Sequence, residues 1–159
     1  MKVLAIDPGY DRIGVAILGR TSGTDTCLYS SCIITDRSAD FAHRLQHIGN
    51  TIETLLQEHQ PDTLAIETLF FNKNVKTAIG VAHARGVILY LAAAYNCTIF
   101  EFGPQEIKVA VTGYGNSDKT AVFAMVRRLL PNIPEHAFDD EYDAIAIGIT
   151  CLAHHGKGR

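Results

Sequence analysis

The sequence lacks a long uninterrupted apolar run, because polar or charged side chains break its apolar stretches every few residues. A helix that crosses a bilayer needs about 20 consecutive, mostly apolar residues, so no membrane span is expected. Met1 is followed directly by a strand-like run instead of a charged segment leading into an apolar one, so no export signal is expected either. These absences predict a cytoplasmic protein.

Paired cysteines are also missing. Cys27, Cys32, Cys97 and Cys151 are far apart and show no spacing typical of a zinc site or a redox dithiol. We therefore expect reduced, half-buried thiols. The sequence has no serine in a nucleophile elbow and no Cys/His pair at a recognisable spacing, which favours chemistry without a side-chain nucleophile.

An overall excess of basic charge is absent, since the net charge is -3. The distribution matters more than the total. Residues 70–130 carry seven Lys or Arg against three Asp or Glu, whereas residues 1–69 carry five against nine and residues 131–159 carry two against five. Cations bound near the acidic segments would offset their charge. Overall acidity therefore does not exclude binding to nucleic acid.

The length of 159 residues, of which 47% are hydrophobic, fits a single domain over residues 1–159, without internal repeats. Apolar patterns predict nine elements. The strands are expected at Lys2–Asp7, Ile13–Leu18, Thr26–Thr35, Thr63–Glu67 and Cys97–Phe102, and the helices at Ala39–His59, Val75–Tyr95, Asp118–Leu130 and Asp139–His155. The first three strands predict an antiparallel meander. The whole pattern predicts an α/β fold with a five-stranded mixed sheet flanked by helices.

Asp7 and Glu67 are each the last residue of a predicted strand. The helix between those strands should return the chain by a right-handed crossover, which makes the two strands parallel. Parallel neighbours present their carboxyl ends at the same sheet edge, so the two acids should converge. Asp-Pro-Gly is also common turn chemistry, which gives Asp7 an alternative explanation. Glu67 has no such structural explanation. It ends an apolar strand, where burying a carboxylate without a compensating charge costs free energy.

Asp140 and Asp143 are three residues apart on the last predicted helix and should share one face. Acids in a first helical turn also complement the helix macrodipole, an explanation that fits Asp139 and Glu141. A cluster of like charges is stable only around positive charge, and Mg²⁺ takes oxygen ligands. The acids at the strand ends and on the helix therefore predict two Mg²⁺ ions, with Mn²⁺ as a substitute, and phosphodiester hydrolysis.

Three segments in order, Ala5–Gly9, Ala65–Glu67 and Asp140–Ala146, resemble the RuvC-type Holliday junction resolvases of bacteria. The resemblance runs the whole length, since the intervening segments Asn72–Asn74, Ala84–Val87 and Gly113–Gly115, followed by Lys119, also match. It implies an RNase H-like fold and a homodimer with two active sites. It also implies Mg²⁺-dependent, symmetrical nicking of four-way DNA junctions in homologous recombination and DNA repair, with the RuvA-RuvB branch-migration complex as partner.

The same resemblance assigns catalysis and metal binding to four acids: Asp7, Glu67, Asp140 and Asp143. It places Phe70 near the junction centre and Lys108 and Lys119 near the scissile phosphate. By residue type alone, Lys73, Lys76, Arg127 and Arg128 would contact phosphates or remain ordinary solvated charges. One of Phe70 and Phe71 would pack in the core and the other against unpaired bases. His136 is the only histidine close to the acids in sequence, and whether it or Asp139 assists is left open.

Several alternatives remain open. The segment Tyr10–Ala16 also looks like that of the related YqgF-type nucleases, which would act on RNA. An actin-like ATP-binding protein also opens with a strand and a hairpin, but it needs a second nucleotide-binding half. A junction-binding protein without catalysis is disfavoured by the complete set of acids. The small residues of Val75–Tyr95 suit either a close helix contact across a dimer or packing against the sheet.

Overall fold

The computed structural model describes residues 1–69, 75–133 and 137–156, and within these the side chains of residues 75–77 are left out. Five strands form one sheet in the order β3-β2-β1-β4-β5. They are β1 (Lys2–Asp7), β2 (Arg12–Thr21), β3 (Thr24–Ile34), β4 (Thr63–Glu67) and β5 (Thr98–Phe102). The helices are α1 (Phe41–His59), α2 (Val75–Ala94), α3 (Pro104–Thr112), α4 (Lys119–Leu129) and α5 (Asp139–His155).

The sheet is mixed, as the sequence predicts. Strands β1, β2 and β3 form the expected antiparallel meander. Strand β4 pairs in parallel with β1, with Ile6 opposite Ile66, and β5 pairs in parallel with β4. The RNase H-like α/β fold is confirmed, and the carboxyl ends of β1 and β4 lie at the same edge of the sheet.

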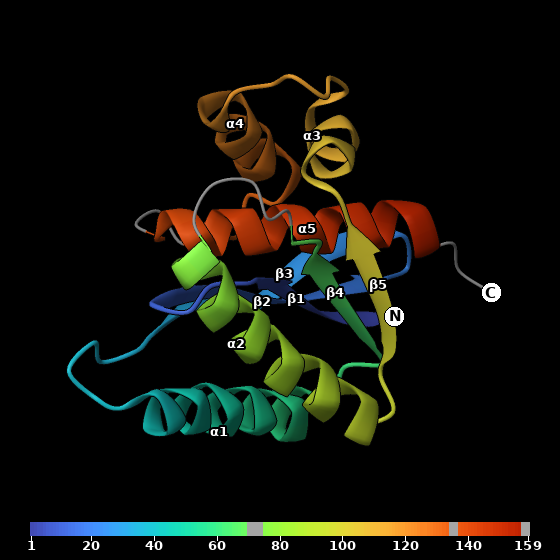
Figure 1. Cartoon of the computed structure of the whole chain (residues 1–159). Coiled ribbons are helices and arrows are strands. Elements are labelled where there is room, and N and C mark those ends of the chain that lie inside the picture. Colours follow the sequence, from blue (N-terminus) through green and yellow to red (C-terminus); the bar gives the residue numbers. More distant parts are fainter. Residues whose placement is uncertain (70–74, 134–136, 157–159) are drawn as a thin grey trace.

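Helices cover both faces of the sheet (Figure 1). Val3 and Ala5 of β1 pack in a core with α5, while Leu4 and Ile6 point to the opposite face and pack in a core with α1 and α2. This alternation follows from the two-residue repeat of a strand. Helices α3 and α4 pack against the outer side of α5 (Figure 1). Among the described residues, no helix is long and apolar enough to cross a bilayer.

All four cysteines are free thiols. Cys27 and Cys32 on β3 are partly buried, whereas Cys97 and Cys151 are fully buried. Two of the four thiols are therefore more buried than the half-buried state that the sequence predicts. Burial raises the pKa of Cys27 and of Cys151, to about 11 and about 12, so both remain protonated at neutral pH.

Helix α3 is missing from the sequence-based prediction. It has only nine residues, and just Ile107 and Val111 are buried, so it shows too little apolar periodicity to be recognised. Its ends do carry signals. Pro104 occupies the first turn, and Gly113 closes the helix at φ 81°, a left-handed conformation that glycine adopts without strain. The error matters because Lys108 lies on this helix and not in a loop.

Helix α5 lies very close to the sheet at two glycines. A Cβ at Gly14 of β2 would overlap the backbone carbonyl of Asp140, and it would lie 3.2 Å from the Cβ of Asp7. A Cβ at Gly148 would lie 2.7 Å from Leu18 Cδ1 and 3.2 Å from the Cβ of Ala5. The absence of both side chains allows the first turn of α5 to lie against the end of β1.

We predict that Gly14→Ala destabilises the protein by about 2 kcal/mol, because overpacking a tight contact forces the backbone to move. Gly19→Ala is the matched control in the same strand, since its Cβ would meet only the flexible end of Leu28 at 3.3 Å. The free energy of unfolding of both variants can be measured by urea titration. Equal stabilities of the two variants would contradict the proposed close approach of α5.

Candidate active site

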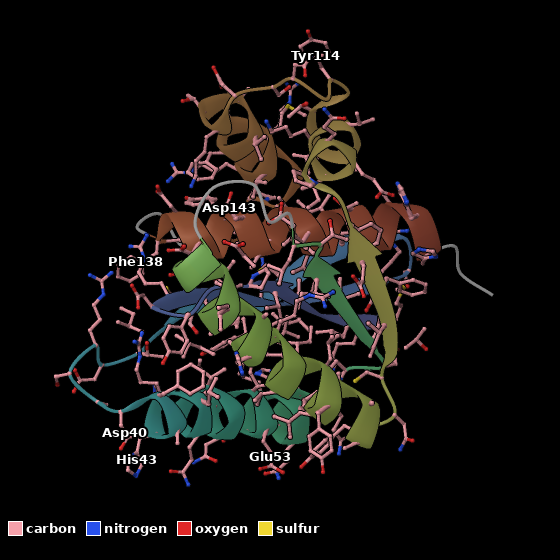
Figure 2. All side chains as sticks on the ribbon, viewed as in Figure 1. Asp40, His43, Glu53, Tyr114, Phe138 and Asp143 are labelled. Carbon is pink, nitrogen blue, oxygen red and sulfur yellow. The ribbon has the colours of Figure 1, made fainter. Side chains whose placement is uncertain are left out.

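Three of the four predicted acids line one cavity. Asp7 ends β1, Glu67 ends β4, and Asp143 lies one turn into α5, near the helix start marked by Phe138 in Figure 2. The cavity has a volume of about 300 Å³. Its other walls come from α3, α4 and α5: Pro104, Ile107, Lys108, Lys119, Val122, Ala146 and Ile147. The predicted convergence of Asp7 and Glu67 is therefore seen in the structure.

The carboxyl of Asp7 is the most perturbed group in this cavity. Its pKa is raised to about 8, first by burial and then by the negative charges of Asp143, Glu67 and Asp140, and Lys119 offsets only part of this. The pKa of Glu67 is also raised, by burial and by Asp143. Repulsion among buried carboxylates means that the cluster favours the binding of positive charge, either protons or metal ions.

Lys119 supplies one positive charge. Its Nζ lies 3.1 Å from Asp143 Oδ2 and 3.5 Å from Asp139 Oδ2. Burial raises the pKa of Asp143 above its ordinary value, although the hydrogen bond from Lys119 opposes the shift. Lys119 is the first residue of α4, after the capping residue Asp118, whose carboxylate accepts the backbone N–H of Ala121. This cap fixes where α4 begins and so where Lys119 enters the cavity.

Asp140 lies beside the cavity and does not line it. Its Oδ2 forms an ion pair of 2.9 Å with Arg12, at the start of β2, and lies 3.9 Å from the Cys32 Sγ. Its charge nevertheless contributes to the raised pKa of Asp7. The sequence-based prediction that helical spacing aligns Asp140 with Asp143 is therefore only partly met, because the two carboxylates pair with different cations.

The other acids of the first turn of α5 serve the helix itself. The Glu141 carboxylate accepts the backbone N–H of Phe138 at 3.1 Å and the Ser30 hydroxyl at 2.9 Å. Glu141 is buried, so this capping contact is shielded from water. Asp139 is exposed, and its Oδ2 lies 3.5 Å from Lys119 Nζ. The contact with Phe138 matches the helix-end explanation for Glu141. Asp139 also lies in the first turn, where an acid complements the macrodipole.

The predicted DNA contacts are described only in part. Lys108 and Lys119 line the cavity. Phe70, Phe71, Lys73 and His136 lie outside the described residues, as does the side chain of Lys76. Arg127 donates from Nε to the Tyr142 hydroxyl at 2.7 Å and so links α4 to α5.

The sequence analysis missed Arg12 as part of the site. Its only local signal is a basic residue in the turn that follows Asp7-Pro8-Gly9. The contact with Asp140 depends on α5 packing over β2, which no short-range pattern reports.

Carboxylate oxygens are suitable ligands for a hard divalent cation, and the repulsion around Asp7 is of the kind that such a cation relieves. Within the described ranges, however, no three Asp, Glu, His or Cys side chains already lie in an arrangement that could hold a metal ion. Lys119 and Arg12 pair with the acids of α5 instead. The donor set consists of carboxylate oxygens, which fits a hard divalent cation.

A mixed five-stranded sheet with acids at the ends of its adjacent central strands defines a nuclease-like protein of the RNase H-like fold. The family is shown by sequence comparison. Residues 3–151 match the model of the family Crossover junction endodeoxyribonuclease RuvC, and the chain belongs to this family.

Individual relatives are similar in sequence to this chain along nearly its whole length. The RuvC crossover junction endodeoxyribonuclease of Thermosipho melanesiensis is 43% identical over 155 residues, which cover 96% of this chain and 97% of the relative. That of Alkaliphilus oremlandii is 41% identical over 157 residues, covering 99% and 95%. The Thermus thermophilus RuvC solved in complex with Holliday junction substrate is 26% identical with a TM-score of 0.90, covering 97% of this chain and 94% of that chain.

The raised pKa of Asp7 predicts a specific pH dependence of stability without metal. Between the ordinary carboxyl pKa of 3.8 and about 8, the folded protein keeps a proton at Asp7 that the unfolded chain has lost. The contribution of Asp7 to the free energy of unfolding is therefore highest below pH 3.8, where Asp7 is protonated in both states, and it falls as the pH rises to about 8. We therefore expect Asp7→Asn, which stays neutral, to exceed the wild type in stability at pH 8 by about 1.4 kcal/mol or more, the equivalent of one pKa unit.

The measurement is urea unfolding in EDTA at several pH values between 4 and 9. Asp36→Asn is the control, because hydrogen bonds from Ser38 lower the pKa of the exposed Asp36 and give the opposite sign. A stability difference between Asp7→Asn and the wild type that does not grow with pH would contradict the assignment.

Proposed function

We propose that this protein resolves four-way (Holliday) DNA junctions by symmetrical, Mg²⁺-dependent phosphodiester hydrolysis in recombination and repair. The carrying observation is the convergence of Asp7, Glu67 and Asp143 in a cavity that also contains Lys108 and Lys119. Membership of the RuvC family supports the branched substrate. The proposal includes a cytoplasmic location and cooperation with the RuvA-RuvB branch-migration complex.

Asp7, Glu67, Asp140 and Asp143 are proposed to hold two Mg²⁺ ions, with Mn²⁺ as a substitute. Such ions supply an activated water and stabilise the leaving oxygen of a phosphodiester. The protein contributes the positioning. The ends of β1 and β4 hold Asp7 and Glu67 on adjacent strands, and α5 brings Asp143 over them.

Lys108 and Lys119 are proposed to contact the phosphodiester backbone. They lie on α3 and α4, on the cavity wall opposite the sheet, so a phosphate entering between them and the acids would meet both charges. Lys73 and Lys76 are proposed as further phosphate contacts and Phe70 as the aromatic at the junction centre. The role of Phe70 rests on the family resemblance, and those of Lys73 and Lys76 rest on their residue type. All three side chains lie outside those that the structure describes.

The direct test is a nicking assay on a fixed synthetic four-way junction. Asp7→Asn removes a metal-binding charge with little change in volume, so we expect Mg²⁺-dependent cleavage to fall by at least about 100-fold. Junction binding, measured in EDTA by gel shift, should remain within about threefold of the wild type because Asp7 is mostly buried and the proposed phosphate contacts of Lys108 and Lys119 are unchanged.

Asp36→Asn is the matched control, since it makes the same chemical change at an exposed turn that contacts Ser38. It should cleave at the wild-type rate. Asp7→Asn that still cuts at the wild-type rate would refute the mechanism. A wild-type protein that cuts structured RNA in preference to the junction would instead favour the YqgF-type alternative, with the same acids.

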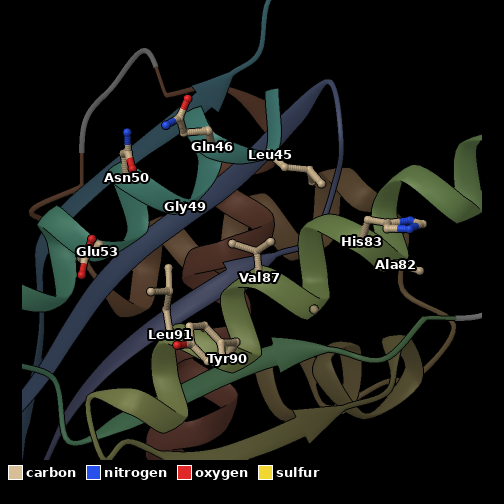
Figure 3. A pocket seen from close by; sticks show the side chains of 11 residues that line it. Leu45, Gln46, Gly49, Asn50, Glu53, Ala82, His83, Val87, Tyr90 and Leu91 are labelled. Carbon is tan, nitrogen blue, oxygen red and sulfur yellow. The ribbon is translucent and has the colours of Figure 1, made fainter. Parts of the chain in front are cut away.

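The homodimer is proposed to form through α1 and α2. An open groove of about 750 Å³ runs between these helices (Figure 3). Ala82 and Gly86 of α2 line this groove, while Ala84 packs in the core, so packing against the sheet is seen and the close helix contact across a dimer is part of the proposal. Beside the hollow, Tyr90 is 73% exposed. A protruding ring next to a hollow can pair with its own copy around a two-fold axis.

We expect Tyr90→Glu to convert the dimer to a monomer at micromolar concentration, because it places a charge in an apolar contact. Tyr114→Glu is the control, since Tyr114 is also exposed but lies beyond α3, on the far side of the molecule from α1 and α2 (Figure 2). Light scattering measures the mass of both variants. Equal masses for the two variants would place the dimer contact elsewhere.

A further inference from the structure

Arg12 is an unassigned cation at the edge of the proposed active site. Its guanidinium Nη2 lies 2.9 Å from Asp140 Oδ2, and its side chain is 49% exposed while that of Asp140 is 20% exposed. The pair therefore joins a carboxylate inside the protein to a cation that reaches solvent. Among the acids proposed to bind metal, Asp140 is held outside the cavity by this contact.

The backbone around Arg12 is firmly fixed. The neighbouring Asp11 accepts a hydrogen bond from Arg44 on α1, and Arg44 is buried and also donates to Thr35. The guanidinium of Arg44 lies 3.7 Å from the centroid of the Tyr10 ring. The turn is thus clamped to α1, while the side chain of Arg12 is half exposed.

The same arrangement occurs on the other acid of α5. Lys119 Nζ pairs with Asp143 at 3.1 Å, and Lys119 is also half exposed. Each acid of the helix pair therefore has its own cation, supplied by a different element. Both carboxylates are thus engaged by cations, and in the described part of the chain no three acidic, histidine or cysteine side chains lie in an arrangement that could hold a metal ion.

We propose that Arg12 is a positioning residue that exchanges partners: it holds Asp140 in the free protein and moves to a DNA phosphate when substrate binds, which releases Asp140 for metal. This inference rests on the proposed function. In the free protein the guanidinium competes with metal for the Asp140 carboxylate. In the complex a DNA phosphate, whose oxygens suit a guanidinium, replaces that carboxylate as its partner. DNA binding and metal binding then strengthen each other.

The first test measures Mn²⁺ binding to the free protein by calorimetry, with no DNA present. Removing the competing charge in Arg12→Gln should tighten Mn²⁺ binding by about three- to fivefold, the scale of a partly exposed ion pair. Arg12→Lys keeps the charge and should stay close to the wild type. Equal Mn²⁺ affinity in Arg12→Gln and the wild type would overturn the proposal.

Arg37→Gln is the matched control. Arg37 is 78% exposed and pairs with Asp11 on the same turn, so its loss removes one nearby positive charge without touching a proposed metal ligand. It should leave Mn²⁺ affinity unchanged. An increase equal to that of Arg12→Gln would mean that general charge, and not the contact with Asp140, sets metal affinity, and the proposal would fail.

The second test measures the coupling between metal and DNA. Affinity for a four-way junction is compared in EDTA and in Ca²⁺, a hard cation that takes oxygen ligands, on samples whose DNA is confirmed to be uncut. Ca²⁺ should increase the affinity for the junction in both proteins. The gain in the wild type should exceed the gain in Arg12→Gln by about three- to fivefold. The same Ca²⁺-dependent gain in both proteins would overturn the exchange.

These outcomes separate the exchange from the proposed function. If Arg12→Gln shows both expected changes relative to the wild type, but the wild type leaves junctions intact in Mg²⁺, junction resolution is refuted and the partner exchange is retained. If the wild type cuts junctions, but Arg12→Gln binds Mn²⁺ with the same affinity as the wild type, the partner exchange is refuted and junction resolution is retained.

Discussion

Repulsion among carboxylates gathered in a small, partly buried space is the constraint on which this structure depends. Asp7 experiences the charges of three other acids in addition to its own burial. Such a cluster raises the free energy of the metal-free protein, and protons, nearby cations or bound metal must compensate it. The ion pairs of Arg12 and Lys119 follow from this need, because Arg12 pairs with Asp140 and Lys119 pairs with Asp143 and Asp139.

The backbone imposes this repulsion through two kinds of packing. Parallel pairing of β1 with β4 makes Asp7 and Glu67 neighbours, regardless of what their side chains prefer. Close packing of α5 on Gly14 then places the acids of the helix above them. Both contacts are stabilised by apolar burial elsewhere in the sheet, so the hydrophobic core supplies the free energy that holds like charges together. The repulsion among the carboxylates lowers the stability of the protein at this site, where the function is expected to need it.

The sequence is informative about this site where chemistry coincides with regular structure. Asp7 and Glu67 could be predicted to meet because the crossover rule fixes the relative direction of their strands. The nine-residue helix α3 was not predicted, because too few of its residues are buried to create a periodic signal, and so Lys108 was not assigned to a helix. The role of Arg12 was missed for a different reason. Its partner lies on α5, at the other end of the chain, and only tertiary packing brings them together.

The difference between Asp140 and Asp143 follows from helix geometry. Residues three apart on a helix share a face, yet they point about 60° apart around the axis at 3.6 residues per turn. On a helix that packs as tightly against the sheet as α5 does, this angle is enough to direct Asp143 into the cavity and Asp140 toward the turn before β2. A spacing that looks like one ligand pair in the sequence therefore becomes two positions with separate cations. Recruiting Asp140 to a metal ion then requires Arg12 to find another partner, and the phosphates of DNA carry the charge that suits it.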